Sequence, residues 1–146
     1  MKRYVYAMAI TKKAAIANIQ SISLPLIEHL LKLYMFPNSG HSVHWAKEVR
    51  NFLYRVPRLK GSNKLLGYKA VREAVSVYED QIGSCINGLK KEYRDLEVER
   101  SNVQEAESLV SKYLDWICAA VCNGEEISSF DVMDKLNELG FGIIFE

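Results

Sequence analysis

The sequence predicts a mainly α-helical fold, a bundle built on a long antiparallel helix hairpin. Apolar residues recur every three or four positions between residues 71 and 120, which is the spacing of an amphipathic helix. Only three prolines and eight glycines occur in 146 residues, so few positions interrupt helices. With 49% hydrophobic and 25% charged residues, the composition is that of a soluble globular protein. A chain of this length is most simply one domain, residues 1–146.

The first forty residues predict a short strand followed by two helices. Larger apolar residues alternate with smaller ones over residues 3–10, which favours a strand. Thr11 can cap a first helix. Pro25 suits the first turn of a second helix capped by Ser23, because its missing N–H costs nothing there. The turn-forming residues 37–40 end that helix.

A third helix is predicted over residues 43–56. Ser42 has a side chain suited to an N-cap, and Pro57 stops the helix. Its apolar residues are spaced four, three, one and three apart, which places them on one face. They are Trp45, Val49, Phe52, Leu53 and Val56.

Two heptad-like series of apolar residues predict the hairpin. The first series is Val71, Val75, Tyr78, Ile82, Cys85 and Leu89, continued by Tyr93 and Leu96. The second is Val103, Ala106, Val110, Tyr113, Ile117 and Ala120. A mainly polar stretch, residues 97–102, separates them. We therefore expect two long helices packed as an antiparallel hairpin over residues 66–122, with the other helices packed on it. The expected core includes Trp45, Val49, Phe52, Leu53, Val75, Ile82, Leu89, Val110, Ile117 and, at its edge, Trp116.

The C-terminal region predicts one short helix. Asn123 and Gly124 close the second arm of the hairpin. Ser128 or Ser129 caps a helix over residues 130–139, which Gly140 ends. The acids near its start (Glu125, Glu126, Asp131 and Asp134) favour the helix dipole. Residues 141–145 are β-prone, and we expect a minor two-stranded pairing of this tail with residues 4–9.

Charge is divided at the middle of the chain. Residues 1–72 contain 13 Lys or Arg and two acids, a net charge of +11. Residues 73–146 contain six Lys or Arg and 16 acids, a net charge of −10. Charge governs association more than it governs fold. We therefore expect the first half to meet an acidic partner, which is the second half of this chain, another protein or a nucleic acid.

No arrangement of residues typical of an enzyme is evident. His41 and His44 lie three residues apart, but a zinc site needs three or four convergent ligands. Cys118, Cys122 and Cys85 fit buried hydrophobic positions. We predict no catalytic residue, no metal and no cofactor. A small hydrolase or nuclease that uses the two histidines is the last alternative.

A basic stretch is the strongest candidate for binding. From residue 32 to residue 72 there are nine Lys or Arg and a single acid. A basic helix face followed by a basic loop can follow a phosphate backbone, and it can equally meet an acidic protein surface. The candidate residues for either partner are Lys47, Arg50, Tyr54, Arg55, Arg58, Lys60 and Lys64.

Residues 29–56 carry a short motif. It consists of the run His29, Leu30, Leu31 and Lys32, then Pro37, then Trp45 and Val49 on a basic amphipathic helix. Over about residues 24–80 this resembles the bacterial family catalogued as domain of unknown function number 29, whose helix with a similar His-Leu-Leu-Lys run precedes a Pro-containing turn and a helix that opens with Trp. The chain departs from that family because it lacks the usual acidic segment before the helix with the His-Leu-Leu-Lys run, and because its second half is longer. The resemblance implies an all-helical fold and no particular activity.

These observations predict a non-enzymatic helical protein that acts by protein–protein association, as a dimer or other homo-oligomer or in a hetero-complex. Nucleic-acid binding through the candidate residues is the alternative. No apolar run reaches the roughly 18 residues needed to span a bilayer, so we expect no membrane partner. Lys12 and Lys13 interrupt the apolar start, and the number of cysteines is odd. Both observations favour a cytoplasmic protein.

Overall fold

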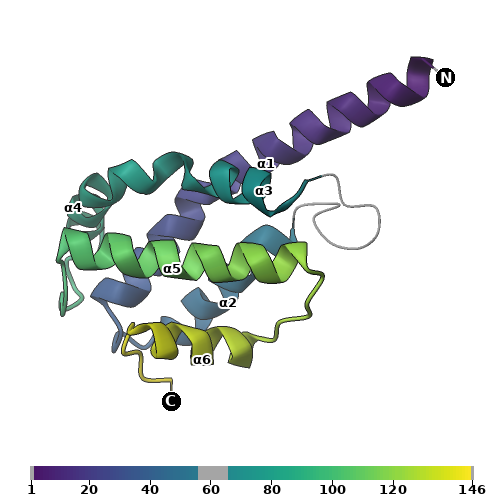
Figure 1. The fold of residues 1–146 in the computed structure, drawn as a ribbon. Helices are drawn as coiled ribbons and strands as arrows, with labels where there is room; N and C mark the ends of the chain where they lie inside the picture. The colour runs from purple at the N-terminus through teal and green to yellow at the C-terminus, as the bar shows by residue number, and fades with distance from the viewer. Residues whose placement is uncertain (1, 56–65, 146) are drawn as a thin grey trace.

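The computed structural model describes residues 2–55 and 66–145, and for residues 2–11 it describes the backbone only. These residues form six α-helices and one short 3₁₀ helix, with no strand among them (Figure 1). The predicted all-helical bundle is therefore confirmed for this part of the chain. The elements are α1 (Lys2–Met35), α2 (Ser42–Tyr54), α3 (Tyr68–Val75), the 3₁₀ helix η1 (Ser76–Gln81), α4 (Ile82–Glu92), α5 (Val103–Cys122) and α6 (Ser129–Leu139).

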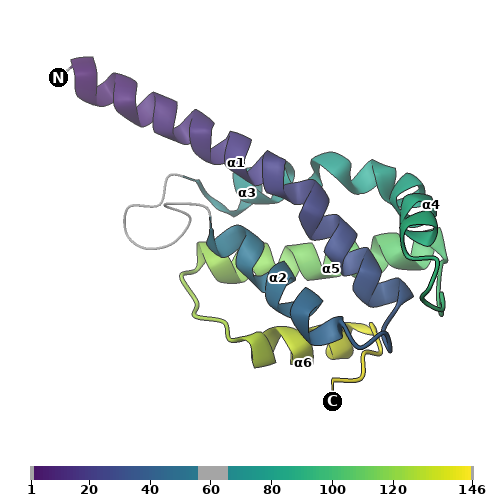
Figure 2. The ribbon, with the colours of Figure 1, turned by 180° about the vertical axis from the view of Figure 1, so that it is seen from behind.

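Helix α1 lies at the centre of the bundle. It packs against α2, α3, η1, α4 and α5, and Figure 2 shows it running diagonally across the other helices. Its second half is enclosed, because seven hydrophobic side chains between Leu26 and Met35 have no exposed surface. The bundle is therefore organised around α1 and its hairpin with α2, not around residues 66–122.

The prediction of separate helices on either side of Ser23 is wrong, because α1 continues through Pro25. A proline inside a helix removes a backbone hydrogen bond and costs about 3 kcal/mol. Full burial of Leu26 and Leu30 offsets this cost, since each contributes about 2 kcal/mol. Ser23 does not act as a cap. Its hydroxyl donates to the carbonyl oxygen of Gln20, 2.7 Å away.

The predicted strand at residues 3–10 and its pairing with the C-terminal tail are also wrong. Residues 3–10 belong to α1, and residues 141–145 form no strand. A lone strand leaves its backbone groups without partners, whereas extending the following helix pairs them locally. The tail is held instead by Asn137, whose side chain exchanges hydrogen bonds of 2.8 and 3.0 Å with the backbone of Ile143.

Helix α2 confirms the prediction for residues 43–56 as far as the structure describes them. The four residues of its predicted stripe that lie in α2 are all buried. Its N-cap is His41, and Ser42 is the first helical residue. The Ser42 hydroxyl donates to the carbonyl oxygen of Pro37 at 2.9 Å, so it closes the loop before the helix.

The first arm of the predicted hairpin is not one helix. The chain passes from α3 through η1 to α4 and leaves helical structure after Glu92. No residue of η1 is buried, and Tyr78 and Cys85 of the predicted series are only half-buried. The chain bends between α3 and α4 (Figures 1 and 2), so it follows the rounded body where one straight helix would leave it. The second arm is confirmed as α5.

The ends of α5 and α6 follow the predicted capping signals. Asn123 follows the last residue of α5. Ser128 caps α6 in a capping box with Asp131, the reciprocal arrangement that satisfies two backbone donors. Gly140 adopts a φ of +112° after α6, a conformation that favours glycine. Of the ten predicted core residues, nine are buried and Trp116 lies half-buried at the edge of the core, as expected.

Candidate interaction surfaces

Four of the seven predicted binding residues lie in the described part of the chain, on α2 and directly after it. Lys47 and Arg55 are exposed, whereas Arg50 and Tyr54 are half-buried. The other three predicted residues, Arg58, Lys60 and Lys64, lie outside the described residues.

Arg50 and Tyr54 bind the connection between α5 and α6. The Arg50 Nε donates to the carbonyl oxygen of Ile127. The Tyr54 hydroxyl donates to the carbonyl oxygen of Glu125 at 2.8 Å. The Arg50 guanidinium carbon also lies 5.1 Å from the centre of the Tyr54 ring. These two side chains therefore hold α2 against the α5–α6 connection, a structural role that their sequence pattern did not reveal.

In the described part of the chain, ion pairs join the two oppositely charged halves at one point. Within the described residues, only Arg72 of the first half pairs with acids of the second half. Its guanidinium lies 2.7 Å from Glu79 and 2.6 Å from Asp115. The remaining pairs stay within one half and are Arg55–Glu48, Arg100–Glu105 and Lys135–Glu138. Neutralisation inside the fold therefore accounts for little of the charge split among these residues.

The described histidines and cysteines form no cluster of three or more groups that could hold a metal ion. His41 and His44 are exposed. His29 is half-buried, and burial lowers its pKa. Burial raises the pKa of the Cys118 thiol to about 12, so this group is protonated near neutral pH.

Residues of the family-like motif lie together around Lys32. This side chain is 9% exposed, and its ammonium group lies 5.7 Å from the centre of the Trp45 ring and 5.2 Å from that of Tyr93. The Phe36 ring lies 5.7 Å from Tyr93 and 6.5 Å from Trp45. A cation over aromatic faces is stabilised by their quadrupoles. Lys32 and Trp45 of the motif therefore help to pack α1, α2 and the end of α4 together.

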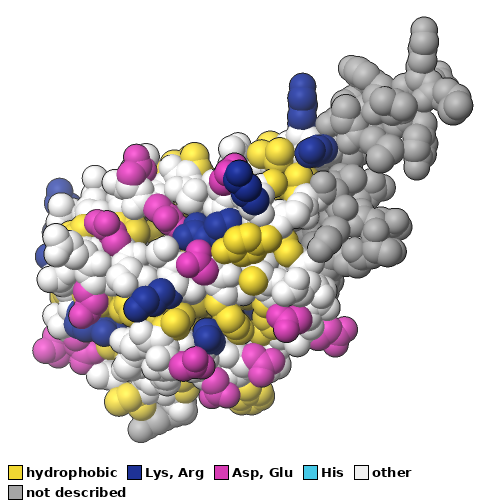
Figure 3. Space-filling model, in the orientation of Figure 1, with side chains coloured by type: hydrophobic (Ala, Val, Ile, Leu, Met, Phe, Trp, Pro, Cys, Tyr) yellow, Lys and Arg dark blue, Asp and Glu magenta, His cyan; other side chains and the backbone are white. Residues whose placement is uncertain are grey.

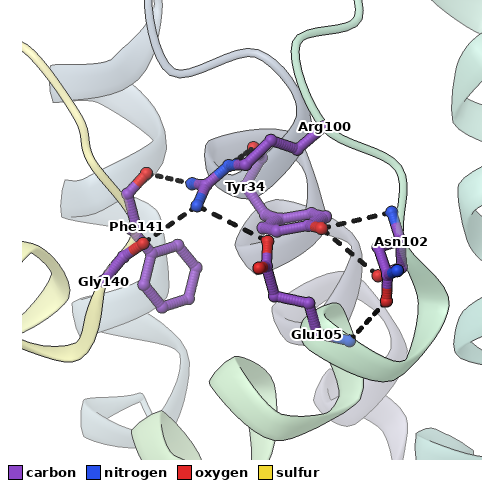
Figure 4. A network of polar contacts seen from close by, with 6 residues as sticks. All are labelled: Tyr34, Arg100, Asn102, Glu105, Gly140 and Phe141. Carbon is purple, nitrogen blue, oxygen red and sulfur yellow. Dashed lines mark hydrogen bonds and ion pairs between the residues drawn. The ribbon is translucent and has the colours of Figure 1, made fainter.

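A second polar network, the Arg100 network, joins distant parts of the chain (Figure 4). Arg100 Nε donates to the carbonyl oxygen of Tyr34 at 3.3 Å, and Nη1 donates to that of Gly140 at 2.9 Å. Its Nη2 donates to the carbonyl oxygen of Phe141. The guanidinium carbon lies 4.5 Å from the centre of the Tyr34 ring. One side chain thus ties the end of α1 to the tail after α6.

The same network fixes the start of α5. The Tyr34 hydroxyl donates to the carbonyl oxygen of Asn102 and accepts from its backbone N–H, both at 3.2 Å. The Asn102 side chain in turn accepts from the backbone N–H of Glu105 at 2.8 Å, which caps α5. No local sequence signal predicts this network, because its members are up to about a hundred residues apart.

The start of α1 extends beyond the bundle as an N-terminal arm, residues 2–14 (Figures 1 and 2). In the described side chains of α1, burial begins at Ala15, while Lys12 and Lys13 are exposed. Thirteen helical residues extend about 20 Å. By sequence the arm contains Lys2, Arg3, Lys12 and Lys13, and no acid precedes Glu28. That run without an acid is a signal in the sequence, but it lies outside the predicted basic stretch of residues 32–72.

An acidic groove lies between α5 and α6. It has a volume of about 350 Å³ and contains five carboxylates and one ammonium group, a net charge of −4. Figure 3 shows acidic side chains gathered over the α6 edge of this face. Exposed Phe130, with 75% of its surface accessible, belongs to the same helix. The lining residues are Trp116, Glu125, Glu126, Ile127, Asp131, Asp134, Lys135 and Glu138.

One stretch of α1, Lys12–Met35, is long and apolar enough to cross a membrane by length and composition. The same properties are expected of a helix at the centre of a core. The seven fully buried side chains between Leu26 and Met35 account for much of this apolar character in the present fold.

Comparison of the chain with protein-family models, with curated proteins and with solved structures gives no match. The resemblance to the family of unknown function therefore stays a prediction.

Proposed function

We propose that this protein is a non-enzymatic helical interaction protein that acts by protein–protein association. The observation that supports this most directly is the N-terminal arm, which continues α1 beyond the bundle. Isolated helices of about this length are marginal in water. Residues 4–10 of the arm are all apolar by sequence, so a partner packed along the arm would bury apolar surface and stabilise it.

The buried polar side chains serve to hold the fold together. Among the described residues they are Ser23, Lys32 and Ser42. The two hydroxyls donate to backbone carbonyl oxygens, and the Lys32 ammonium group lies over two aromatic rings. Each of the three groups thus has a role in packing. This supports a protein whose binding takes place at its surface.

The mass of the full chain in solution tests this proposal. We expect light scattering at about 50 µM protein and about 50 mM salt to give a mass above the monomer value of 16.7 kDa. That mass should fall as the salt concentration rises toward about 500 mM, because charge contributes to association. A monomer at both salt concentrations, together with no partner recovered on the tagged chain, would refute association as the function.

Nucleic-acid binding is a second candidate, favoured by the exposure of Lys47 and Arg55 on and beside α2. Duplex DNA and RNA should then bind with an affinity that falls steeply with salt concentration. The double variant Lys47→Ala/Arg55→Ala should bind more weakly. The matched control Lys90→Ala/Lys91→Ala removes two exposed cations of α4 and should bind normally. Absence of any mobility shift at low salt rules this candidate out.

A further inference from the structure

We propose that the N-terminal arm of one copy docks into the acidic groove between α5 and α6 of a second copy, so that two chains exchange arms. This inference rests on the proposed function and identifies its surface and its partner.

The position of the arm indicates that it does not bind the groove of the same chain. Figure 1 places the start of α1 beyond one end of the bundle and α6 along the opposite edge. The arm is continuous with the buried part of α1, which anchors its direction. Folding back would break the helix near Ala15, whereas a second chain can reach the groove with α1 intact.

The opposite charges of the arm and the groove favour the groove as the site that binds the arm. The arm carries four cations and no acid, and its described cations Lys12 and Lys13 are exposed. The groove carries a net charge of −4. Glu125 and Glu126 are exposed in the connection just before α6. Complementary potentials of this kind steer association and fix its register.

The apolar parts of the two surfaces also correspond. In the arm, the cations fall at residues 2–3 and 12–13, and of the eight residues between them the first seven, 4–10, are apolar. In the groove, half-buried Trp116 and buried Ile127 lie among the carboxylates, and exposed Phe130 follows on α6. A helix laid in a groove buries such apolar residues between charged ends. The arm of about 20 Å is comparable to α6, whose eleven residues span about 16 Å.

Exchange of identical arms is reciprocal, so it produces a closed dimer with two equivalent contacts. A membrane surface could also attract a basic, apolar helix. The acidic groove on the same chain favours a second copy, because a membrane bound by the arm would leave the complementary charge of that groove unused.

Charge reversal on each side tests the exchange. Light scattering of the full chain at about 50 mM salt should give twice the monomer mass of 16.7 kDa. The variants Lys12→Glu/Lys13→Glu and Glu125→Lys/Glu126→Lys should each raise the dimer dissociation constant about tenfold or more, since attraction becomes repulsion at both contacts. Mixing the two variants should restore a mixed dimer, because one of its contacts joins the reversed arm to the reversed groove and the other joins the wild-type arm to the wild-type groove.

Matched controls reverse the same number of charges elsewhere. Lys90→Glu/Lys91→Glu on α4 and Asp95→Lys/Glu97→Lys after it change exposed residues outside the arm and groove, and both should leave the dimer intact. Circular dichroism should show that each variant is folded. A dimer that persists in both arm and groove variants overturns the proposed contact and leaves association as the function.

Two other results also overturn the arm exchange. One is a wild-type chain that is monomeric but recovers a different protein. The other is a monomer that binds phosphatidylcholine vesicles containing phosphatidylserine and loses this binding in Lys12→Glu/Lys13→Glu.

Discussion

Replacing Arg100 with Met should destabilise the fold by about 2–4 kcal/mol. The guanidinium makes hydrogen bonds to three backbone carbonyl oxygens and packs on the Tyr34 ring. A buried hydrogen bond from a charged group is worth about 1.5–3 kcal/mol, and less where water can replace it. Since this side chain is 29% exposed, we count about 0.5–1 kcal/mol for each of the three bonds. The ring contact adds about 0.5–1 kcal/mol. The exposed ion pair with Glu105 adds little.

Urea unfolding followed by tryptophan fluorescence measures this loss, and the Tm should fall by about 10 °C for a chain of this size. Arg94→Met is the matched control. Its exposed side chain donates only to the carbonyl oxygen of Lys91 within the same turn, so its change should stay below about 0.5 kcal/mol. In Arg100→Met the amide hydrogens of residues 140–143 should also exchange faster, because the tail loses its anchor. Equal unfolding midpoints for the two variants would refute the role assigned to Arg100.

Three further predictions concern buried groups. Tyr113→Phe removes a fully buried hydroxyl that donates to the carbonyl oxygen of Val49 at 3.1 Å, and urea unfolding should show a loss of about 1–2 kcal/mol. An unchanged midpoint would mean that this bond contributes nothing. Burial lowers the pKa of His29 below its ordinary 6.5, so the unfolded chain binds the proton more readily. Stability linked to this group is therefore complete above pH 6.5 and is lost as the pH falls, and thermal scans should show a smaller loss toward pH 5 in His29→Gln. Finally, the raised pKa of Cys118, about 12, should delay its labelling by a thiol reagent until the chain unfolds, while half-buried Cys85 reacts first. Mass spectrometry of the labelled peptides checks this order.

The helices that sequence analysis located correctly carry their signals locally. Helix α5 has uninterrupted apolar spacing, and α6 has both a capping box and a C-terminal glycine. These signals act within a few residues, so they can be read without knowledge of the tertiary structure. The boundaries of both helices follow from them.

The errors arose where tertiary packing overrides local preference. Pro25 ordinarily begins or breaks a helix, but the buried residues that follow it keep α1 continuous. The series from Val71 to Leu89 has regular spacing, and yet η1 interrupts it because the chain bends around the bundle. Neither outcome is encoded in a window of ten residues.

For the candidate surfaces, the sequence predicts the charge of each half of the chain but not which residues lie together. The sequence shows that the first half is basic and the second half acidic, but it does not show that Arg50 and Tyr54 bind the α5–α6 connection. It also does not show that Glu125 and Asp134, nine residues apart, line one groove beside Trp116. Such juxtapositions depend on how α5 and α6 pack, so they become visible only in the folded chain.

Salt distinguishes a charge split that holds the fold together from one that serves association. If most cations of the first half were paired with acids of the second, each exposed pair would contribute about 0.2–1 kcal/mol, and about 500 mM salt would remove several kcal/mol of stability. Among the described residues, only Arg72 makes such pairs, and its side chain is 16% exposed and therefore weakly screened. We expect the unfolding free energy of the Lys12→Glu/Lys13→Glu variant to change by less than about 1 kcal/mol between about 50 and 500 mM salt, whereas the mass of the wild-type chain falls toward that of the monomer. A loss of more than about 2 kcal/mol in the variant would show that the charge split stabilises the fold itself.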